Sequence, residues 1–315
     1  MLITDLQRVR AAILAQPWAI LPDYLAGIEA LAERAMQADA LAWLERDGHA
    51  ARLAGGLEAV ASVGSRLEGA RMSTVRDGTA VVPVFGPIFP RVNMLNSSAG
   101  GTALDAIMAD LRVAQASTAV ERILMVFDTP GGVVSGLGEA AVAIRESAKP
   151  ITGFVTGIAA SAGYWLASQA AELVLEPAGS VGSIGVVMSM SRQVQPGSDG
   201  RQAYEITSSG APRKRPDPST DEGRAAIQEE LDAIEGVFVG DVAAGRKKSP
   251  AYVRREFGQG GMVPAARAVE VGMADRIGTL EATLNGLARR AGPTPSPNRR
   301  ALAERDLELR QRRAS

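Results

Sequence analysis

The sequence predicts an α/β protein, and three observations point to this class. Apolar segments with strand character alternate with segments of about 10–15 residues that have helical spacing. Glycine-rich turns follow several of the apolar segments, as they do at strand-to-helix connections in α/β cores. Hydrophobic residues make up 46% of the chain and charged residues 22%, and 315 residues suffice for one large domain or two smaller ones.

The predicted core begins at residues 79–90, "TAVVPVFGPIFP", where the prolines and Gly86 favour an edge strand that runs into a loop. The elements after it are a helix over "ALDAIMADLRVAQA", a strand over "RILMVFDTPGG", a helix over residues 136–147, a strand over "PITGFVTGIAA" followed by a helix, and a strand and loop over "AELVLEPAGSVGSIGVVMS". This alternation of strands with helices of about 10–15 residues indicates an α/β core.

The chain divides into three predicted parts. Residues 1–72 are rich in Ala, Leu, Glu and Arg with helical spacing, which predicts a helical N-terminal region. Residues 73–285 hold the α/β core, including a polar loop, a long helix over residues 221–244 and a closing loop, helix and strand. Residues 286–315 form a Pro/Ser linker and a charged C-terminal tail.

Composition limits the possible functions. The formal net charge of −1 gives no reason to expect a nucleic acid or an anionic membrane as partner. Cysteine is absent, and we find no apolar run near the roughly 18 residues of a membrane span and no good signal peptide, so we expect a cytoplasmic protein. The single histidine, His49, lies in a polar segment and is expected to be a solvated surface residue. A multi-histidine metal site is therefore excluded and a Ser-His-Asp triad is unexpected, which leaves Lys, Asp, Glu or Tyr for acid-base chemistry. We expect no metal and no cofactor.

Two glycine-containing motifs could carry chemistry. "DTPGG" ends an apolar strand, and its consecutive glycines allow backbone N–H groups to approach a ligand, as an oxyanion hole requires; the alternative is a plain strand-to-helix turn. "GSVGSIGVV" at residues 179–187 could lie against a substrate backbone, or could be a tight turn with a bulge.

Ser161 in "AASAGYW" stands where a strand is predicted to pass into a helix. A hydroxyl at this junction can project into a cleft, and the N–H groups at the start of the helix favour developing negative charge. The alternative role is a helix cap. Ser180 and Ser183 are weaker candidates for a nucleophile, because neither precedes a clear helix.

If Ser161 is a nucleophile, a lysine must take its proton. The chain has four lysines, and only Lys214, between Arg213 and Arg215, follows the glycine motifs in a loop of its own. Arginine stays protonated, whereas a lysine can act as a base once burial and neighbouring cations lower its pKa. The alternative interpretation of "RKR" is a basic surface loop.

Together and in this order, the motifs resemble those of the serine-lysine peptidases of the signal peptide peptidase A family, and within it the phage and prophage proteases of head maturation (capsid assembly). The resemblance covers roughly residues 75–282 and rests on "VFGPI", "GGT", "FDTPGGVVSG", "GIAASAGYWLASQA", "GSVGSIGVV", "ITSSGAPRKRPDP" and "AVEVGMADRIGTLEA". It implies a Clp-protease/crotonase-like fold of repeated ββα units and a serine endopeptidase with Ser161 as nucleophile and Lys214 as base. Many members have the lysine one residue earlier, where this chain has Arg213, so the assignment of Lys214 assumes a one-residue shift.

The resemblance also implies the rest of the site and the setting. The N–H groups of Gly132 and Ala162, with Gly131 as a second choice, would form the oxyanion hole. An extended substrate would lie between the "VVPVFGPI" and "GSIGVV" segments and add a strand to the sheet edges. The residues expected to contact it are Val84, Gly86, Pro130, Gly182, Ser183, Ile184 and Gly185. Capsid or scaffold proteins would be the substrates, in the host cytoplasm and the phage prohead, and the enzyme would be a homo-oligomer.

Two other functions stay open from the residues alone. An acyl-CoA enzyme of the crotonase fold would also use backbone N–H groups, but it needs a carboxylate near the glycine-rich turns. The glutamates closest to these turns are Glu172 and Glu176, after the predicted helix. A non-catalytic head-assembly or scaffold protein could keep the same fold without activity.

Overall fold

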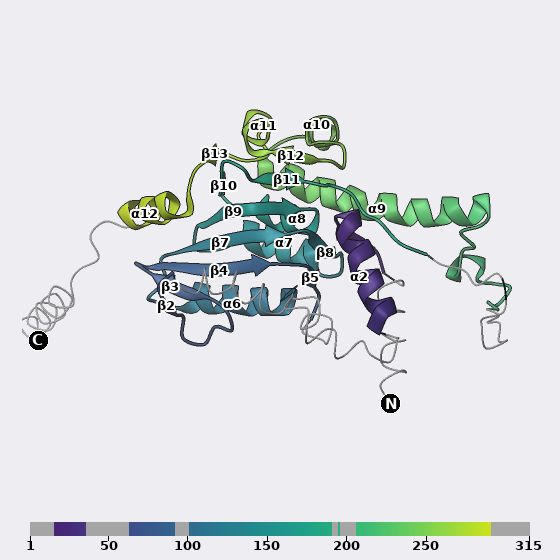
Figure 1. Cartoon of the computed structure of the whole chain (residues 1–315), viewed down its shortest axis with the longest axis horizontal. Helices are drawn as coiled ribbons and strands as arrows, with labels where there is room; N and C mark the ends of the chain where they lie inside the picture. The colour runs from purple at the N-terminus through teal and green to yellow at the C-terminus, as the bar shows by residue number, and fades with distance from the viewer. Residues whose placement is uncertain (1–15, 36–62, 92–100, 191–194, 196–205, 291–315) are drawn as a thin grey trace, which may run out of the picture.

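The computed structural model describes residues 16–35, 63–91, 101–190, 195 and 206–290. Within these residues the strands form two sheets flanked by helices, so the predicted α/β class is confirmed (Figure 1). His49, most of the predicted helical N-terminal region and the charged C-terminal tail lie outside the described residues.

The larger sheet has the strand order β12-β11-β9-β7-β4-β3-β2, with β10 beside β9 and β13 beside β10. Its strands are β2 (Ser65–Arg66), β3 (Thr74–Arg76), β4 (Thr79–Phe85), β7 (Arg122–Thr129), β9 (Ile151–Ala160), β10 (Glu172–Leu175), β11 (Ser180–Gly182), β12 (Met262–Pro264) and β13 (Arg276–Ile277). The central strands β4, β7 and β9 are parallel, and β10 and β11 both continue the parallel pairing along β9. Parallel central strands of this kind must be covered on both faces.

Helices cover the two faces of this sheet unequally. They are α6 (Leu104–Ala116), α7 (Leu137–Arg145), α8 (Ala162–Ala167), α9 (Asp221–Arg246), α10 (Pro250–Glu256), α11 (Ala265–Glu270) and α12 (Leu280–Arg290). The main core packs alternate strand residues such as Val82, Met125 and Phe127 against α6 to α9. A second, smaller cluster packs the opposite alternate residues, such as Val126, against Leu284 and Leu287 of α12. This period of two is what a strand buried on both faces requires.

The second sheet is small and has the order β1-β8-β5-β6, from β1 (Trp18–Ile20), β5 (Ile88–Phe89), β6 (Thr102–Ala103) and β8 (Gly131–Val133). Strand β1 was not predicted, because helical spacing dominates the residues around it. It leads directly into α2 (Pro22–Ala35), which lies against the body of the domain beside β8 and β5 (Figure 1).

Strand β4 was predicted to be an edge strand, but only its second half lacks a described strand on one side. β3 pairs with residues Thr79 to Val81, whereas β7 pairs with β4 along its whole length. The Phe85 N–H points away from β7, to the Thr102 hydroxyl at 3.0 Å, so Pro83, two residues earlier, faces the same side. No described strand pairs with β4 on that side beyond Val81, and Pro83 therefore costs no ladder hydrogen bond.

Asp275 fastens the end of α9 to the sheet. Its carboxylate accepts hydrogen bonds from Arg246 at 2.8 and 3.1 Å and from the Leu173 N–H at 2.7 Å. Partial burial alone would raise the pKa of Asp275, but these hydrogen bonds and the Arg246 charge outweigh it and hold the pKa below its usual range.

We therefore expect Asp275→Asn to lower the free energy of unfolding by about 1–2 kcal/mol at pH 7, because the carboxylate is partly exposed to solvent. A carboxyl with a depressed pKa contributes fully above its unfolded pKa of about 4 and loses this contribution as the pH falls through the folded value. Urea unfolding at pH 7 and pH 3 should show a smaller difference between wild type and variant at pH 3. An equal difference at both pH values would contradict the assignment.

Candidate active site

Ser161 occupies a strained turn between β9 and α8. Its φ is +51° and its ψ is −115°, a conformation that is costly for a residue with a Cβ. The turn is held because the Ser161 N–H donates to the Gly182 carbonyl at 2.7 Å and the Ser161 carbonyl accepts from the Trp165 N–H at 2.8 Å. Gly163 lets the helix start close to β7, since a Cβ there would lie 2.3 Å from the Thr129 Cγ2 atom. A strained strand-to-helix turn of this kind is the geometry that presents a nucleophilic serine.

The Ser161 hydroxyl does not cap α8. Although Ser161 is the N-cap residue, its side chain accepts no capping hydrogen bond. The hydroxyl instead donates to the Gly185 carbonyl over a long distance of 3.4 Å, and Ser161 is only 1% exposed. Ala162 is the first residue of α8, so its N–H is among those that an α-helix leaves without an intrahelical partner. The hydroxyl and this N–H therefore lie at the same turn.

Tyr164 and Trp165 fix α8 in the core. The Tyr164 hydroxyl donates to the Met273 carbonyl at 3.0 Å, and burial raises the pKa of this phenol far above its usual value, so it stays a protonated donor. The Trp165 ring stacks on Phe238 of α9 at a centroid distance of 4.3 Å. Tyr164 is thus a structural anchor and unsuited to acid-base chemistry near neutral pH.

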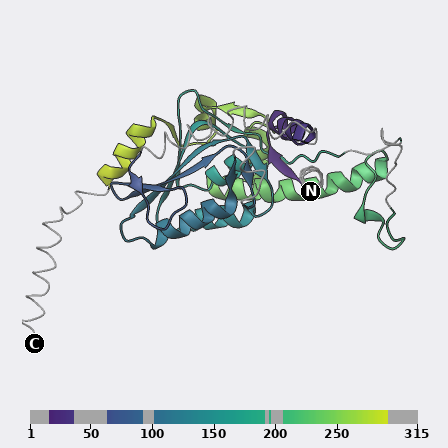
Figure 2. The same cartoon turned by 60° about the horizontal axis from the view of Figure 1, so that its bottom comes forward.

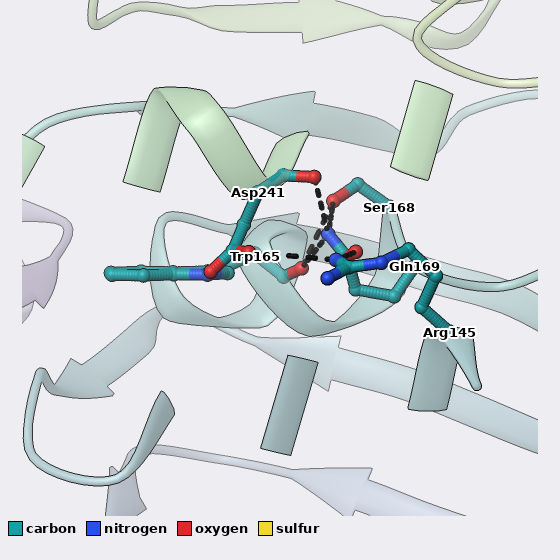
Figure 3. A network of polar contacts seen from close by, with 5 residues as sticks. All are labelled: Arg145, Trp165, Ser168, Gln169 and Asp241. Atoms are coloured by element: carbon teal, nitrogen blue, oxygen red, sulfur yellow. Dashed lines mark hydrogen bonds and ion pairs between the residues drawn. The ribbon is translucent and has the colours of Figure 1, made fainter. Parts of the chain in front are cut away.

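A partly buried polar network ties α8 to α7 and α9 (Figure 3). The Asp241 carboxylate accepts from the Trp165 Nε1 at 2.8 Å and pairs with Arg145 at 3.5 Å. Arg145 also donates to the Gln169 Oε1 at 2.6 Å, and the Gln169 amide donates to the Ser168 hydroxyl at 2.8 Å. The sequence analysis did not predict this network. The sequence feature that could have indicated it is Asp241, a single aspartate among the apolar residues "FVGDVAAG" of α9. The network fixes the helix that Ser161 precedes.

The predicted oxyanion glycines form β8, between β5 and β1. Gly131 has a φ of +108°, and its N–H donates to the Thr129 hydroxyl at 3.2 Å. Gly132 pairs with Ala19 on one side and with Ile88 on the other. A Cβ on either glycine would lie 2.2 Å or less from a backbone oxygen, so both positions require glycine. The Pro130 carbonyl accepts from the Leu21 N–H at 2.9 Å.

The remaining predicted contact residues fall into two groups. Gly182 ends β11, and Ser183, Ile184 and Gly185 form the turn after it. The Ser161 N–H donates to the Gly182 carbonyl, and the Ser161 hydroxyl donates to the Gly185 carbonyl. Val84 is fully buried within β4 in the main core, and the Gly86 N–H donates to the Asp128 carbonyl at 2.9 Å. The "VVPVFGPI" segment ends in β5, which lies beside β8. The "GSIGVV" segment ends at Val187, which pairs with Trp18 of β1. Strands β8 and β1 therefore lie between the two segments that were predicted to border the substrate.

Lys214 lies away from Ser161 in the single chain. It is exposed, in the short 3-10 turn η1 (Pro212–Lys214) that precedes α9. This segment and the first half of α9 extend beyond the body of the domain in both views (Figures 1 and 2). Neighbouring Arg213 pairs with Glu229 of α9 at 2.9 Å, in an exposed ion pair. The structure therefore does not bring the two predicted dyad residues together within one chain.

The other three lysines have local roles. Lys149 donates to the Ala114 and Ser117 carbonyls at the end of α6, at 2.9 and 2.6 Å. Lys247 is the left-handed C-cap of α9, and the Lys248 ammonium lies 5.1 Å from the centroid of the Tyr252 ring. Glu172, which an acyl-CoA enzyme could have used, pairs with Arg276 at 2.7 Å. In the described part of the chain, no group of three or more His, Cys, Asp or Glu side chains is placed to hold a metal ion.

Comparison with known proteins matches residues 143–293 to "Peptidase family S49". The chain is 31% identical over 215 residues to capsid assembly protease C of Escherichia phage lambda, covering 66% of this chain and 48% of that protein. It is 34% identical over 122 residues to the head-tail preconnector protein GP5 of Enterobacteria phage P21, covering 38% and 24%. A putative signal peptide peptidase SppA of Enterococcus faecium is 27% identical over 194 residues, covering 58% and 54%. The chain thus spans about half, or less, of the length of the two phage proteins. Among the described helices, none is both long and apolar enough to cross a bilayer.

Proposed function

Since the chain carries a peptidase family S49 domain, we propose that it is a serine endopeptidase in which Ser161 is the nucleophile and Lys214 the general base. The observation that carries the proposal is the strained backbone of Ser161, whose hydroxyl is left uncommitted to helix capping. Strain at a residue that glycine would occupy more cheaply is typical of functional positions. The Ala162 N–H and the Gly132 N–H would stabilise the oxyanion.

The position of Lys214 supports a dyad formed between subunits. α9 has 26 residues and is therefore about 39 Å long. Apart from Gly223 in its first turn, its buried residues all lie in the second half, from Phe238 onward. The projecting half carries an apolar stripe at helical spacing: Ile227, Leu231 and Ile234 are partly exposed and Val237 is 56% exposed. Such a stripe on an unsupported helix favours packing against a second copy of the chain. In that assembly η1 would carry Lys214 to the Ser161 of a neighbour.

The chemistry follows from these roles. The neutral Lys214 amine takes the Ser161 proton while the Ser161 Oγ bonds to the scissile carbonyl carbon, giving an oxyanion held by the backbone N–H groups. The C–N bond then breaks, and the Lys214 ammonium gives its proton to the leaving amine. Lys214 next takes a proton from water, the resulting hydroxide attacks the acyl ester, and Ser161 recovers its proton as the acid product leaves. Burial of Lys214 between subunits would favour the neutral amine that the first step needs.

The finer architecture and setting belong to the same proposal. The stacked β-strands and helices fit a Clp-protease/crotonase-like fold of repeated ββα units, with the catalytic domain over residues 73–285. We propose that the substrates are capsid or scaffold proteins and that the chain cleaves them in the host cytoplasm and the prohead, because a capsid assembly protease is among the relatives. Neither a metal nor a cofactor enters the mechanism.

This proposal is tested by co-expressing the chain with candidate phage capsid and scaffold proteins. We expect new N-termini in one of these proteins, identified by mass spectrometry, in cells that carry the wild-type chain. The matched control is the Ser161→Ala chain at the same expression level, which should yield only intact proteins. Identical cleavage products in both cultures would contradict the proposal.

A further inference from the structure

Strand β1 is inserted between the two segments that border the Ser161 turn. On one side it pairs antiparallel with β8, with Trp18 opposite Val133 and Ile20 opposite Gly131. On the other side Trp18 exchanges two hydrogen bonds with Val187, both of 2.8 Å. Val187 is two residues from Gly185, whose carbonyl accepts from the Ser161 hydroxyl. A peptide that adds a strand to a sheet edge binds by backbone contacts of this kind.

The register places one carbonyl of β1 at the predicted oxyanion donor. The Leu21 N–H donates to the Pro130 carbonyl at 2.9 Å, and the Val134 N–H donates to the Pro17 carbonyl at 3.4 Å. Hydrogen-bonded pairs alternate along an antiparallel ladder, so Ala19 and Gly132 form the bonded pair between these two. The Ala19 carbonyl therefore accepts from the Gly132 N–H, the group assigned above to the oxyanion hole.

The side chains of β1 alternate in the same way. Ala19 is fully buried in the main core, in the cluster that also contains Ala162 and Leu137. Trp18 and Ile20 face the opposite side, in a separate cluster with Phe89 and Val133, where the Trp18 and Phe89 rings meet edge to face at 6.0 Å. The small side chain thus faces the main core, which also holds the start of α8, and the two large side chains face the separate cluster.

We propose that residues 17–21 are an internal peptide ligand of the substrate cleft, bound in the register of a substrate with the Ala19 carbonyl at the scissile position. The proposal rests on the function proposed above and identifies where its peptide substrates bind. It means that β1 keeps the cleft closed, and that a protein substrate enters only when β1 leaves. It also means that the cleft takes a small side chain at the position of Ala19.

Both ends of the segment are anchored, which favours an inhibitor over a substrate. The ladder continues past Ala19 to Leu21, and α2 begins at Pro22. Leu25 and Ile28 of α2 are 3% and 6% exposed and belong to the same cluster as Trp18. If the bond after Ala19 opened, both new ends would stay in place and could rejoin, so the segment would persist in the cleft.

A disulfide can lock and release β1, because the chain has no cysteine of its own. Trp18 and Val133 form a non-hydrogen-bonded pair, whose Cα atoms lie about 4.5 Å apart, within the range for a disulfide. We would introduce Trp18→Cys and Val133→Cys into the full-length Ser161→Ala chain and measure binding of a fluorescent peptide with the sequence of residues 16–22. We expect the reduced form to bind the peptide at least about tenfold more tightly than the oxidised form, because the tethered strand competes at a high effective concentration.

Three controls make the result decisive. The single Trp18→Cys chain should bind the peptide equally with and without oxidant, and a peptide with Arg in place of Ala19 should not bind. Ala19→Pro releases β1 in a second way, by removing the Ala19 N–H while leaving every cleft side chain in place, and it should bind like the reduced pair. Binding that ignores the redox state, or no binding to folded Ala19→Pro chain, would overturn the proposal. So would accumulation of wild-type chain cut after Ala19.

The same disulfide pair separates this proposal from the proposed function. With Ser161 restored, hydrolysis of a short fluorogenic peptide should rise on reduction in parallel with binding. If binding follows the redox state but no form hydrolyses the peptide, the internal ligand stands and the peptidase assignment fails. If hydrolysis occurs equally in both forms, the peptidase stands and the internal ligand fails.

Discussion

Replacing Ser161 by alanine is expected to lower peptide hydrolysis by at least about 10³-fold, because Ser161 is the proposed nucleophile and the other described serine with a positive φ, Ser183, does not precede a helix. The fold should be retained. Alanine bears the same backbone strain as serine, and the hydroxyl makes one long hydrogen bond of 3.4 Å, so the free energy of unfolding should change by less than about 0.5 kcal/mol. Hydrolysis rates and thermal unfolding of the purified assembled protein measure the two effects.

Ser147→Ala is the matched control for this variant. The Ser147 hydroxyl makes an ordinary hydrogen bond to the Lys149 carbonyl at 2.8 Å and belongs to no part of the proposed site. Hydrolysis by this variant should stay close to wild type. A Ser161→Ala chain that keeps wild-type activity, with the protein free of contaminating peptidase, would show that Ser161 is not the nucleophile.

Replacing Lys214 by alanine is expected to abolish hydrolysis equally, and mixing should partly restore it. In a random mixture of Ser161→Ala and Lys214→Ala chains, about a quarter of the sites between neighbouring subunits receive both an intact serine and an intact lysine. Activity should therefore recover to about a quarter of wild type after the two chains are assembled together. This result follows from the exposed position of Lys214 in η1, a segment that projects with the first half of α9 beyond the body of the domain.

Two variants complete this test. Lys248→Ala removes an exposed lysine in the connector after α9 and should leave hydrolysis unchanged. Lys214→Arg should be as inactive as Lys214→Ala, because a guanidinium stays protonated and cannot take the serine proton. No recovery in the mixture would mean that the dyad forms within one chain, and full activity of Lys214→Ala would remove Lys214 from the mechanism.

The sequence alone determined the features that depend on neighbouring residues. Alternating apolar periods predicted the main strands and helices, and the long helix over residues 221–244 appears as α9 at Asp221–Arg246. The junction at Ser161 and the glycines of "DTPGG" could also be found, because strand ends, small residues and turns leave local patterns. The single histidine and the four lysines also narrowed the possible acid-base chemistry, because few side chains of these kinds are available for catalysis in any fold of the chain.

Tertiary structure decided what depends on distant partners. Strand β1 has three residues, and its partners Val133 and Val187 lie more than a hundred positions away, so no local period could reveal it. The same holds for the Asp241 network, whose members come from three helices and the turn after α8. The separation of Lys214 from Ser161 depends on where α9 points, and that direction is set by packing of its second half. Short-range patterns encode which elements form, whereas burial and backbone pairing between remote segments decide which of these elements lie beside the Ser161 turn.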